Sequence, residues 1–406
     1  MFFGAGAVSM TRKYGIRDAA PTCAESCIFP EIFTMPDEDF LSRKLKEREE
    51  QGALRRLRLP VGNVDLCSND YLGVVRYGLL ENGILDATLI ADTPDAHGSG
   101  GSRLLAGNYP LVEETERQIA VFHAAPAALI YNSGYDANLG LLSSVPQRGD
   151  VILYDSLSHA SIRDGMRLSP AQAYAFAHND LTELKIRLEK FSKMGNVFVV
   201  TESVFSMDGD MAPLVEMADL CRQYDAQLIV DEAHATGVVG PNGEGLVQEL
   251  GLADECFARV HTFGKAVGCH GAAILGSTLL RDYLINFSRS FIYTTALPPA
   301  SVRAIARAYA LLPRLDAERE RLLSLIERFR DTPTLWERLD TSTPIQVVIV
   351  PGNTAVKALA HRLQGAGLDV RPILSPTVAK GRERLRIVLH AFNTEEEIDK
   401  LTLLLG

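Results

Sequence analysis

The chain has 406 residues, with 41 Lys plus Arg against 51 Asp plus Glu, and therefore carries a formal charge of −10. This acidic balance argues against nonspecific nucleic-acid binding, because modules that bind nucleic acid carry a surplus of basic side chains. Hydrophobic residues make up 47% and charged residues 23% of the chain, which is typical of a folded protein. No apolar run reaches the ~18 residues that a membrane-spanning helix needs, so we expect no membrane partner.

Six cysteines are scattered over the chain, too few for a disulfide scaffold, and this usage favours the cytoplasm. Cys23 and Cys27 have no second Cys or His pair near them, so we predict no metal site. The basic residues near the N-terminus follow an apolar start, an order that does not fit a secretory signal. We therefore treat residues 1–36 as an N-terminal extension.

Residues 37–96 are predicted to form a helical segment and an arm. The charged stretch that begins near residue 37 has apolar positions at Phe40, Leu41 and Leu45, which indicates a surface helix. The segment VDLCSNDYLGV (64–74) is a short apolar run that leads into a turn.

Residues 97–298 are predicted to form a large α/β domain. Short apolar runs without polar alternation are separated there by amphipathic helical segments, a pattern typical of a mainly parallel sheet covered on both faces. The predicted strands are AALIY (127–131), DVILYD (150–155), NVFVVTE (196–202), QLIVDE (227–232), ARVHTFGK and GAAILG.

Residues 299–406 are predicted to form a connecting helix and a small C-terminal α+β domain. The helical stretch after Pro298 contains Pro313, where we expect a kink or a break. Strand, helix, strand, strand and helix follow in IQVVIV (345–350), AVKALAHRLQGAG, LDVRPI, RLRIVLHAF and EEEIDKLTLLL.

Ligands of open α/β sheets bind beyond the carboxyl ends of the strands, so the residues that follow each predicted strand are the first candidates. AALIY is followed by Asn132, Ser133, Gly134 and Tyr135 and then by a helical segment. The small residues at this strand-to-helix turn suit a phosphate group. His159 follows the next strand on a loop. Each signal is weak by itself, because many such turns bind nothing and a lone histidine on a loop is usually a surface residue.

The predicted strand QLIVDE ends in Asp231 and Glu232 and is followed by Ala233 and His234. This tetrapeptide suggests a helicase-type nucleotide site. That interpretation requires a G-x-x-x-x-G-K-[ST] loop, and the chain has none, since Lys265 is followed by alanine. The glycine-rich segment 98–102 contains no lysine and does not match a dinucleotide fingerprint either.

Lys265 stands between Gly264 and Ala266, small neighbours that would let a planar ligand approach its amine. Taken alone it would be an ordinary solvated lysine. The order anion turn, His159, Asp231, Lys265 contains the parts of a pyridoxal 5′-phosphate site: a turn for the phosphate, a carboxylate for the ring nitrogen and an amine for the Schiff base.

At these residues the sequence resembles the α-oxoamine synthases, fold-type-I pyridoxal-phosphate enzymes that condense an amino acid with an acyl thioester and release CO2. The resemblance covers the chain from about residue 37 to its end. The matching segments are SNDYLG (68–73), HGSGGSRLLAGNYPLVEETE (97–116), NSGYDANLGLL (132–142), DSLSHASIRDG (155–165), TESVFSMDGDMAPL (201–214), VDEAHATGVVGPNGEG (230–245), HTFGKAVGCHGAA (261–273) and YTTALPPA (293–300).

The resemblance implies a role for each matching residue. Lys265 would bind the cofactor covalently and remove the α-proton, Asp231 would pair with the ring nitrogen, and His159 would stack on the ring. The remaining residues implied by the resemblance are Ser206 and His234 for the phenolic oxygen, Gly134, Tyr135, Thr262 and a neighbouring subunit's Thr294 or Thr295 for the phosphate, Asn69 and Arg386 for the amino-acid carboxylate, and Arg55 and Thr377 for other substrate contacts.

Within the family, the sequence resembles the branch that joins L-alanine to pimeloyl-CoA or pimeloyl-carrier protein, in the segments TFGK, YTTALPP and SPTVAKGRERLRIVL. The resemblance also implies that the active enzyme is a homodimer. One departure concerns the acyl end: Leu374 and Ser375 precede Pro376 where many members have Arg, and the nearest arginine is Arg371. The alternatives are glycine C-acetyltransferase, 5-aminolevulinate synthase, serine palmitoyltransferase and a noncatalytic protein that keeps the fold.

Overall fold

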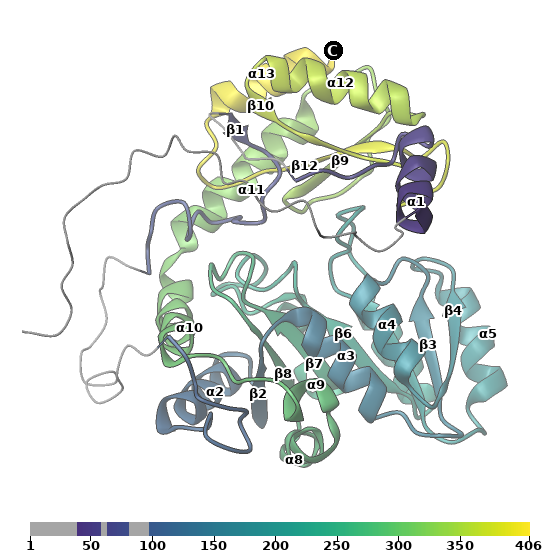
Figure 1. Cartoon of the computed structure of the whole chain (residues 1–406), viewed down its shortest axis with the longest axis vertical. Helices are drawn as coiled ribbons and strands as arrows, with labels where there is room; N and C mark the ends of the chain where they lie inside the picture. The colour runs from purple at the N-terminus through teal and green to yellow at the C-terminus, as the bar shows by residue number, and fades with distance from the viewer. Residues whose placement is uncertain (1–38, 58–62, 81–96) are drawn as a thin grey trace, which may run out of the picture. The chain divides into compact units, whose positions relative to one another are not determined.

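The computed structural model describes residues 39–57, 63–80 and 97–406 (Figure 1). The chain separates into two compact units, Met1–Leu54 and Arg55–Gly406. The first unit contributes one described helix, α1 (Asp39–Glu50), and all of its side chains are exposed, as expected of a surface helix. The predicted N-terminal extension, with Cys23 and Cys27, lies outside the described residues.

The core of the second unit is a seven-stranded sheet with the strand order β2-β8-β7-β6-β5-β3-β4. Only β8 runs antiparallel to its neighbours, so the predicted mainly parallel sheet of a fold-type-I enzyme is confirmed. The strands are β2 (Ala127–Tyr131), β3 (Val151–Asp155), β4 (Gln172–Phe176), β5 (Val197–Glu202), β6 (Gln227–Asp231), β7 (Cys256–Thr262) and β8 (Ala272–Gly276).

Both faces of this sheet are buried, which explains why its strands show no polar alternation. Val151 and Leu153 of β3 belong to one hydrophobic cluster, and Ile152 between them belongs to another. Successive side chains of a strand point to opposite faces, so each cluster covers one face. The helices and 3-10 turn between residues 110 and 292 are α2 (Pro110–Phe122), α3 (Gly134–Ser144), α4 (Ala160–Leu168), α5 (Leu181–Phe191), α6 (Leu214–Gln223), α7 (Leu246–Glu249), η2 (Ala253–Glu255), α8 (Thr278–Phe287) and α9 (Arg289–Ile292).

The strand β4 was absent from the sequence prediction. It is an edge strand that pairs only with β3, and its first two residues, Gln172 and Ala173, are exposed. An edge strand that is half solvated has no continuous apolar run, so the pattern that identified the central strands was missing there.

The predicted break at Pro313 is confirmed. The helix α10 (Pro299–Leu311) ends before the short 3-10 turn η3 (Leu312–Arg314), and α11 (Asp316–Asp331) begins after it. Proline cannot donate the backbone hydrogen bond that a continuous helix needs. In Figure 1, α11 continues from α10 toward the smaller C-terminal sheet.

The C-terminal part contains a three-stranded antiparallel sheet with the order β11-β12-β9. The predicted single strand LDVRPI is divided, because its first half pairs with the N-terminal arm and its second half with β12. The elements are β1 (Val64–Asp65), β9 (Ile345–Ile349), α12 (Asn353–Gly365), β10 (Leu368–Asp369), β11 (Arg371–Ile373), β12 (Arg384–Val388) and α13 (Glu395–Leu405).

The domain limits at residues 96/97 and 298/299 remain predictions. Within the described ranges, the helices fall short of the length and apolar character that crossing a bilayer requires.

Candidate active site

A cavity of about 400 Å³ lies at the carboxyl ends of β5, β6 and β7, beside the N-terminus of α3. Parallel strands bring their carboxyl ends to one edge of the sheet, which is why residues far apart in sequence meet there. Most of the predicted site residues line this cavity: Asn69, Gly134, Tyr135, His159, Ser206, Asp231, His234, Thr262, Lys265 and Arg386.

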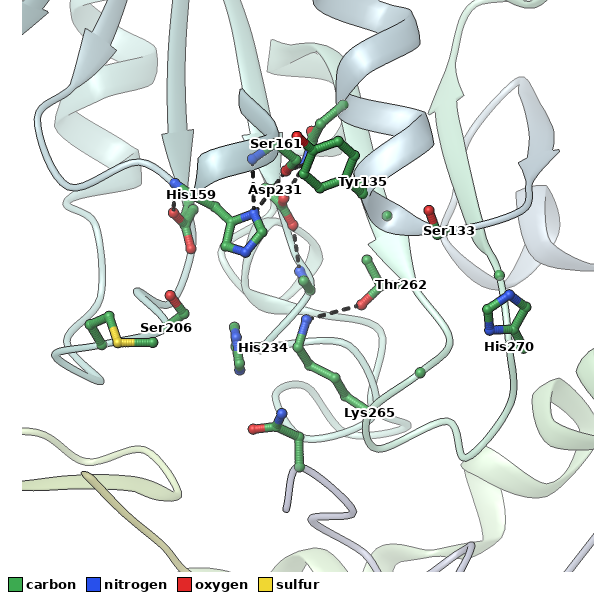
Figure 2. A pocket seen from close by; sticks show the side chains of 18 of the residues that line it. Ser133, Tyr135, His159, Ser161, Ser206, Asp231, His234, Thr262, Lys265 and His270 are labelled. Atoms are coloured by element: carbon green, nitrogen blue, oxygen red, sulfur yellow. Dashed lines mark hydrogen bonds between the residues drawn. The ribbon is translucent and has the colours of Figure 1, made fainter. Parts of the chain in front are cut away.

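Lys265 follows β7 in a short loop, and its Nζ lies 3.4 Å from Thr262 Oγ1 (Figure 2). Burial lowers the pKa of Lys265 below its ordinary value, although the carboxyl groups of Asp231 and Glu202 act in the opposite direction. A lowered pKa increases the fraction of neutral amine, which is the form that attacks an aldehyde.

Asp231 is the last residue of β6 and is 6% exposed. Its Oδ2 accepts a hydrogen bond of 2.7 Å from Asn138 Nδ2, and its Oδ1 accepts one of 2.9 Å from the backbone N–H of Ala233. Asn138 also donates to Ser161 Oγ at 3.0 Å. The carboxyl group is therefore held in place by α3 and by its own turn, and it can face a protonated ring nitrogen.

His159 is the N-cap residue of α4, and its ring lies beside Asp231 (Figure 2). Its backbone N–H donates to Glu202 Oε1 at 2.7 Å, and its Nδ1 lies 2.8 Å from Ser161 Oγ. Burial lowers the pKa of His159. A neutral imidazole fixed at both backbone and ring presents a flat face to the cavity.

The N-terminus of α3 supplies a cradle for an anion. Ser133 caps the helix by accepting a hydrogen bond of 3.1 Å from the backbone N–H of Asp136. A Cβ at Gly134 would stand 2.4 Å from Thr262 Cγ2, so only glycine permits this close approach of helix and strand. Ser133, Gly134, Tyr135 and Thr262 line the cavity together, and free N–H groups at a helix N-terminus bind phosphate well.

A second group of polar residues connects the cavity to the C-terminal sheet. Arg386 of β12 donates to Asn69 Oδ1 at 3.1 Å through Nη2 and to the carbonyl of Ser206 at 2.7 Å through Nε. Tyr71 donates to the same Asn69 oxygen at 3.2 Å and lies 2.6 Å from His234 Nδ1. The guanidinium group is thus positioned to pair with a carboxylate inside the cavity.

Four predicted residues do not line this cavity. Thr294 and Thr295 lie beside Asn132, whose Nδ2 donates to Thr294 Oγ1 at 2.9 Å and to the carbonyl of Thr295 at 2.8 Å. Their assignment to a neighbouring subunit's phosphate stays a prediction. Arg55 donates to Thr377 Oγ1 at 3.4 Å, and both residues are exposed.

The sequence prediction missed several buried residues at the cavity, among them Asn138, Glu202 and Tyr71. Each carried a signal, since Asn138 is a polar residue inside the apolar helical segment DANLGLL and Glu202 is the last residue of an apolar strand. Tyr71 lies in SNDYLG, directly after a residue already singled out. Only the fold reveals that their side chains converge with Asp231 and His234.

One group of described residues, His178, Asp208 and Asp210, has ligand atoms close enough together for a metal ion. Its members already have partners, because Arg384 pairs with Asp208 and His178 Nε2 lies 2.7 Å from Asp210 Oδ2. Burial alone would lower the pKa of His178, but hydrogen bonds to Asp155 and Asp210 raise it to about 10. A protonated histidine explains this cluster without a metal.

Residues 62–402 match the family described as aminotransferase class I and II. The chain belongs to this family. Pyridoxal 5′-phosphate is the cofactor of this aminotransferase-family chain, and the cavity fits it: a buried amine, a fixed carboxylate, a flat imidazole and a helix N-terminus with a glycine at its closest approach.

The curated relatives of this family member confirm its resemblance to the α-oxoamine synthases, since their printed names belong to that branch. An 8-amino-7-oxononanoate synthase of Emericella nidulans is 44% identical over 390 residues, which cover 89% of the chain and 93% of that protein. The 8-amino-7-oxononanoate synthase 2 of Bacillus subtilis is 36% identical and covers 90% of the chain and 96% of its own length.

Solved structures agree with this placement in the family. Serine palmitoyltransferase from S. paucimobilis superposes with a TM-score of 0.80 at 26% identity and covers 90% of the chain and 96% of its own. The 8-amino-7-oxononanoate synthase of Francisella tularensis superposes with a TM-score of 0.71 at 28% identity, over 85% of the chain and 97% of its own.

Proposed function

We propose that this acyltransferase condenses L-alanine with pimeloyl-CoA, or with a pimeloyl-carrier protein, to give 8-amino-7-oxononanoate, the free thiol and CO2 in biotin biosynthesis. The observation that carries the proposal is the convergence of Lys265, Asp231 and the α3 cradle in one cavity, in a chain whose curated relatives carry that synthase name. The scattered cysteines support a cytoplasmic location.

Pyridoxal 5′-phosphate supplies a protonated ring that withdraws negative charge from the α-carbon of a bound amino acid. Asp231 would keep the ring nitrogen protonated, since its two hydrogen bonds already hold the carboxyl group in place. His159 would cover the ring, while Ser206 and His234 would hydrogen-bond the phenolic oxygen. Backbone N–H groups at 134–135 and the hydroxyl of Thr262 would bind the phosphate.

Two further groups act on the amino acid. Arg386, held by Asn69 and the carbonyl of Ser206, would bind the α-carboxylate. Lys265, with its pKa lowered by burial, would take the α-proton as a neutral amine and return a proton at the end of the reaction. The α-carbon of the amino acid would then form a C–C bond to the acyl carbonyl carbon while the thioester C–S bond breaks and the thiol leaves. The resulting β-keto acid would lose its carboxylate as CO2.

Release of CoA from a panel of substrate pairs tests this function. The pairs combine alanine, glycine and serine with pimeloyl-CoA, acetyl-CoA and palmitoyl-CoA. We expect alanine with pimeloyl-CoA to turn over fastest. One methylene in an apolar pocket changes selectivity by only ~1 to 3 kcal/mol, so glycine and serine should react slowly rather than not at all.

Other outcomes of the panel would reassign the chain. Faster turnover of glycine with acetyl-CoA would indicate a glycine C-acetyltransferase, and of serine with palmitoyl-CoA a serine palmitoyltransferase. If no pair releases CoA, the noncatalytic alternative is favoured.

Arg55 is the better of two candidates for the distal carboxylate of the acyl chain. Arg371 donates to Asp369 at 2.8 Å, so its charge is already paired, whereas the contact of Arg55 with Thr377 is a hydroxyl contact of 3.4 Å. We expect Arg55→Ala to raise KM for pimeloyl-CoA about tenfold, equivalent to ~1.4 kcal/mol, with little change in KM for alanine. A larger effect of Arg371→Ala, the matched control, would reverse the assignment.

The active form is proposed to be a homodimer in which Thr294 or Thr295 reaches the neighbour's phosphate. Mixing inactive Lys265→Ala chains with inactive Thr295→Ala chains should then restore part of the activity, because some sites regain both residues. Sedimentation of the mixture checks the assembly. An active monomer, or no recovery after mixing, would contradict the shared site.

A further inference from the structure

A second buried carboxyl group faces the cavity beside Asp231. Glu202, the last residue of β5, is the register partner of Asp231 on the neighbouring parallel strand, and both line the cavity. Neighbouring strands lie about 4.8 Å apart, so their carboxyl groups lie close together on the same face. Glu202 is only 3% exposed, and none of the roles assigned above uses it.

Glu202 also binds the residue that caps α4. Its Oε1 accepts the 2.7 Å hydrogen bond from the backbone N–H of His159, which is the N-cap residue of that helix. His159 in turn lies against Ser161 and faces Asp231 (Figure 2). The carboxyl group of Glu202 therefore connects the position of the imidazole to the strand that ends next to Asp231.

The surroundings of Glu202 favour its neutral form. Burial and the charge of Asp231 raise the pKa of Glu202 to about 8. They outweigh the opposing effects of the backbone N–H groups of His159 and Ser206 and of the Lys265 charge. The other titratable or charged side chains that line the cavity are the imidazoles of His159, His234 and His270, the phenol of Tyr135 and the always charged Arg386. Two adjacent carboxyl groups in a buried site cannot both ionise easily.

We propose that Glu202 is a positioning residue that works as the neutral acid: it holds His159 through its acceptor oxygen and leaves Asp231 as the cavity's carboxylate. The proposal rests on the proposed function, which assigns Asp231 and His159 to the cofactor. When Glu202 loses its proton to water, a second negative charge stands beside Asp231 and Lys265. That charge raises the proton affinity of the Lys265 amine and changes the site that the cofactor meets.

The first test uses the protein without cofactor, so that it does not depend on the proposed function. Glu202→Gln is the neutral isostere and keeps the acceptor oxygen. Because the folded pKa of about 8 lies above the ordinary value of 4.5, the stability that the wild-type acid contributes is present at low pH and is lost as the pH rises toward 8. The melting temperature of Glu202→Gln should therefore increase relative to wild type from pH 5 to pH 8 and then level off.

Two results of this test would overturn the proposal. One is a melting-temperature difference that stays constant or falls over that range, which would mean that Glu202 is already ionised in the folded protein. The other is a Glu202→Gln chain that does not fold, because the working form is proposed to be neutral.

The second test measures the dissociation constant of pyridoxal 5′-phosphate by fluorescence at pH 7 and pH 9. At pH 7 the dissociation constant of Glu202→Gln should lie within about twofold of the wild-type value. Between pH 7 and pH 9 the wild-type constant should change as Glu202 ionises, and Glu202→Gln should lack that part of the change. Glu202→Leu should bind about tenfold more weakly at both pH values, because the backbone N–H of His159 loses its acceptor.

Glu232→Gln is the matched control. Glu232 follows Asp231 directly but accepts hydrogen bonds from Ser203 Oγ and from the backbone N–H groups of Leu246 and Val247, away from the cavity lining. This variant should lose stability without altering the pH dependence of cofactor binding. If Glu202→Gln binds as poorly as Glu202→Leu, the neutral form is not the working one. A wild type that binds no cofactor would instead overturn the proposed function.

Discussion

Lys265→Ala is expected to abolish the visible absorption that the wild type shows after incubation with pyridoxal 5′-phosphate, and to lower turnover about a thousandfold or more. A thousandfold loss corresponds to ~4 kcal/mol of barrier. The reason is that Lys265 is the cavity lysine, with its amine beside Thr262 and its pKa lowered by burial. Absorbance spectra and CoA release measure the two effects.

Lys193→Ala serves as the control, because Lys193 is exposed in the turn after α5 and should change neither spectrum nor rate. A wild type that remains colourless after incubation would contradict the assignment of Lys265. So would a Lys265→Ala chain that keeps the wild-type spectrum.

Asp231→Asn is expected to bind the cofactor but to exchange the α-proton of alanine about a hundredfold more slowly, a loss of ~3 kcal/mol or more of transition-state stabilisation. An amide cannot hold the ring nitrogen protonated as a carboxylate does. Proton NMR in deuterium oxide follows the exchange at saturating cofactor.

The same substitution should also destabilise the protein. Asp231 accepts hydrogen bonds on both of its oxygens, from Asn138 and from Ala233, whereas asparagine has one acceptor oxygen. We expect a loss of ~1 to 3 kcal/mol in the free energy of unfolding. Asp219→Asn, on the exposed side of α6, should leave exchange unchanged. Exchange at the wild-type rate in Asp231→Asn would disprove the electron-withdrawing role.

The central strands could be predicted from the sequence because both of their faces are buried. The apolar runs that end at Tyr131, Asp155, Glu202 and Asp231 were found for this reason, and the Pro313 break followed from proline's missing N–H. The edge strand β4 was not predicted, because its exposed half carries no apolar pattern.

The candidate site divides in the same way. Asp231 was suggested by its place at the end of a strand and Lys265 by its place after one, and the family resemblance gave them roles. Glu202 could be assigned to the site only from the strand register, which pairs it with Asp231. Tyr71 could be assigned only from the contact of its hydroxyl with His234. Such pairings depend on which strands and loops become neighbours, information that a single sequence does not carry locally.

The parallel pairing of β1 with β10 joins residues 64–65 to residues 368–369, about three hundred positions along the chain. Closing so long a loop costs more entropy than forming the shorter-range contacts of the large sheet, so we expect this contact to form after them. Asn69 and Arg386 depend on that closure, whereas the carboxyl ends of β5 to β7 do not. The carboxyl ends of β5 to β7 can therefore form the cofactor cradle before β12 brings Arg386 to Asn69, so cofactor binding can precede completion of the amino-acid carboxylate site.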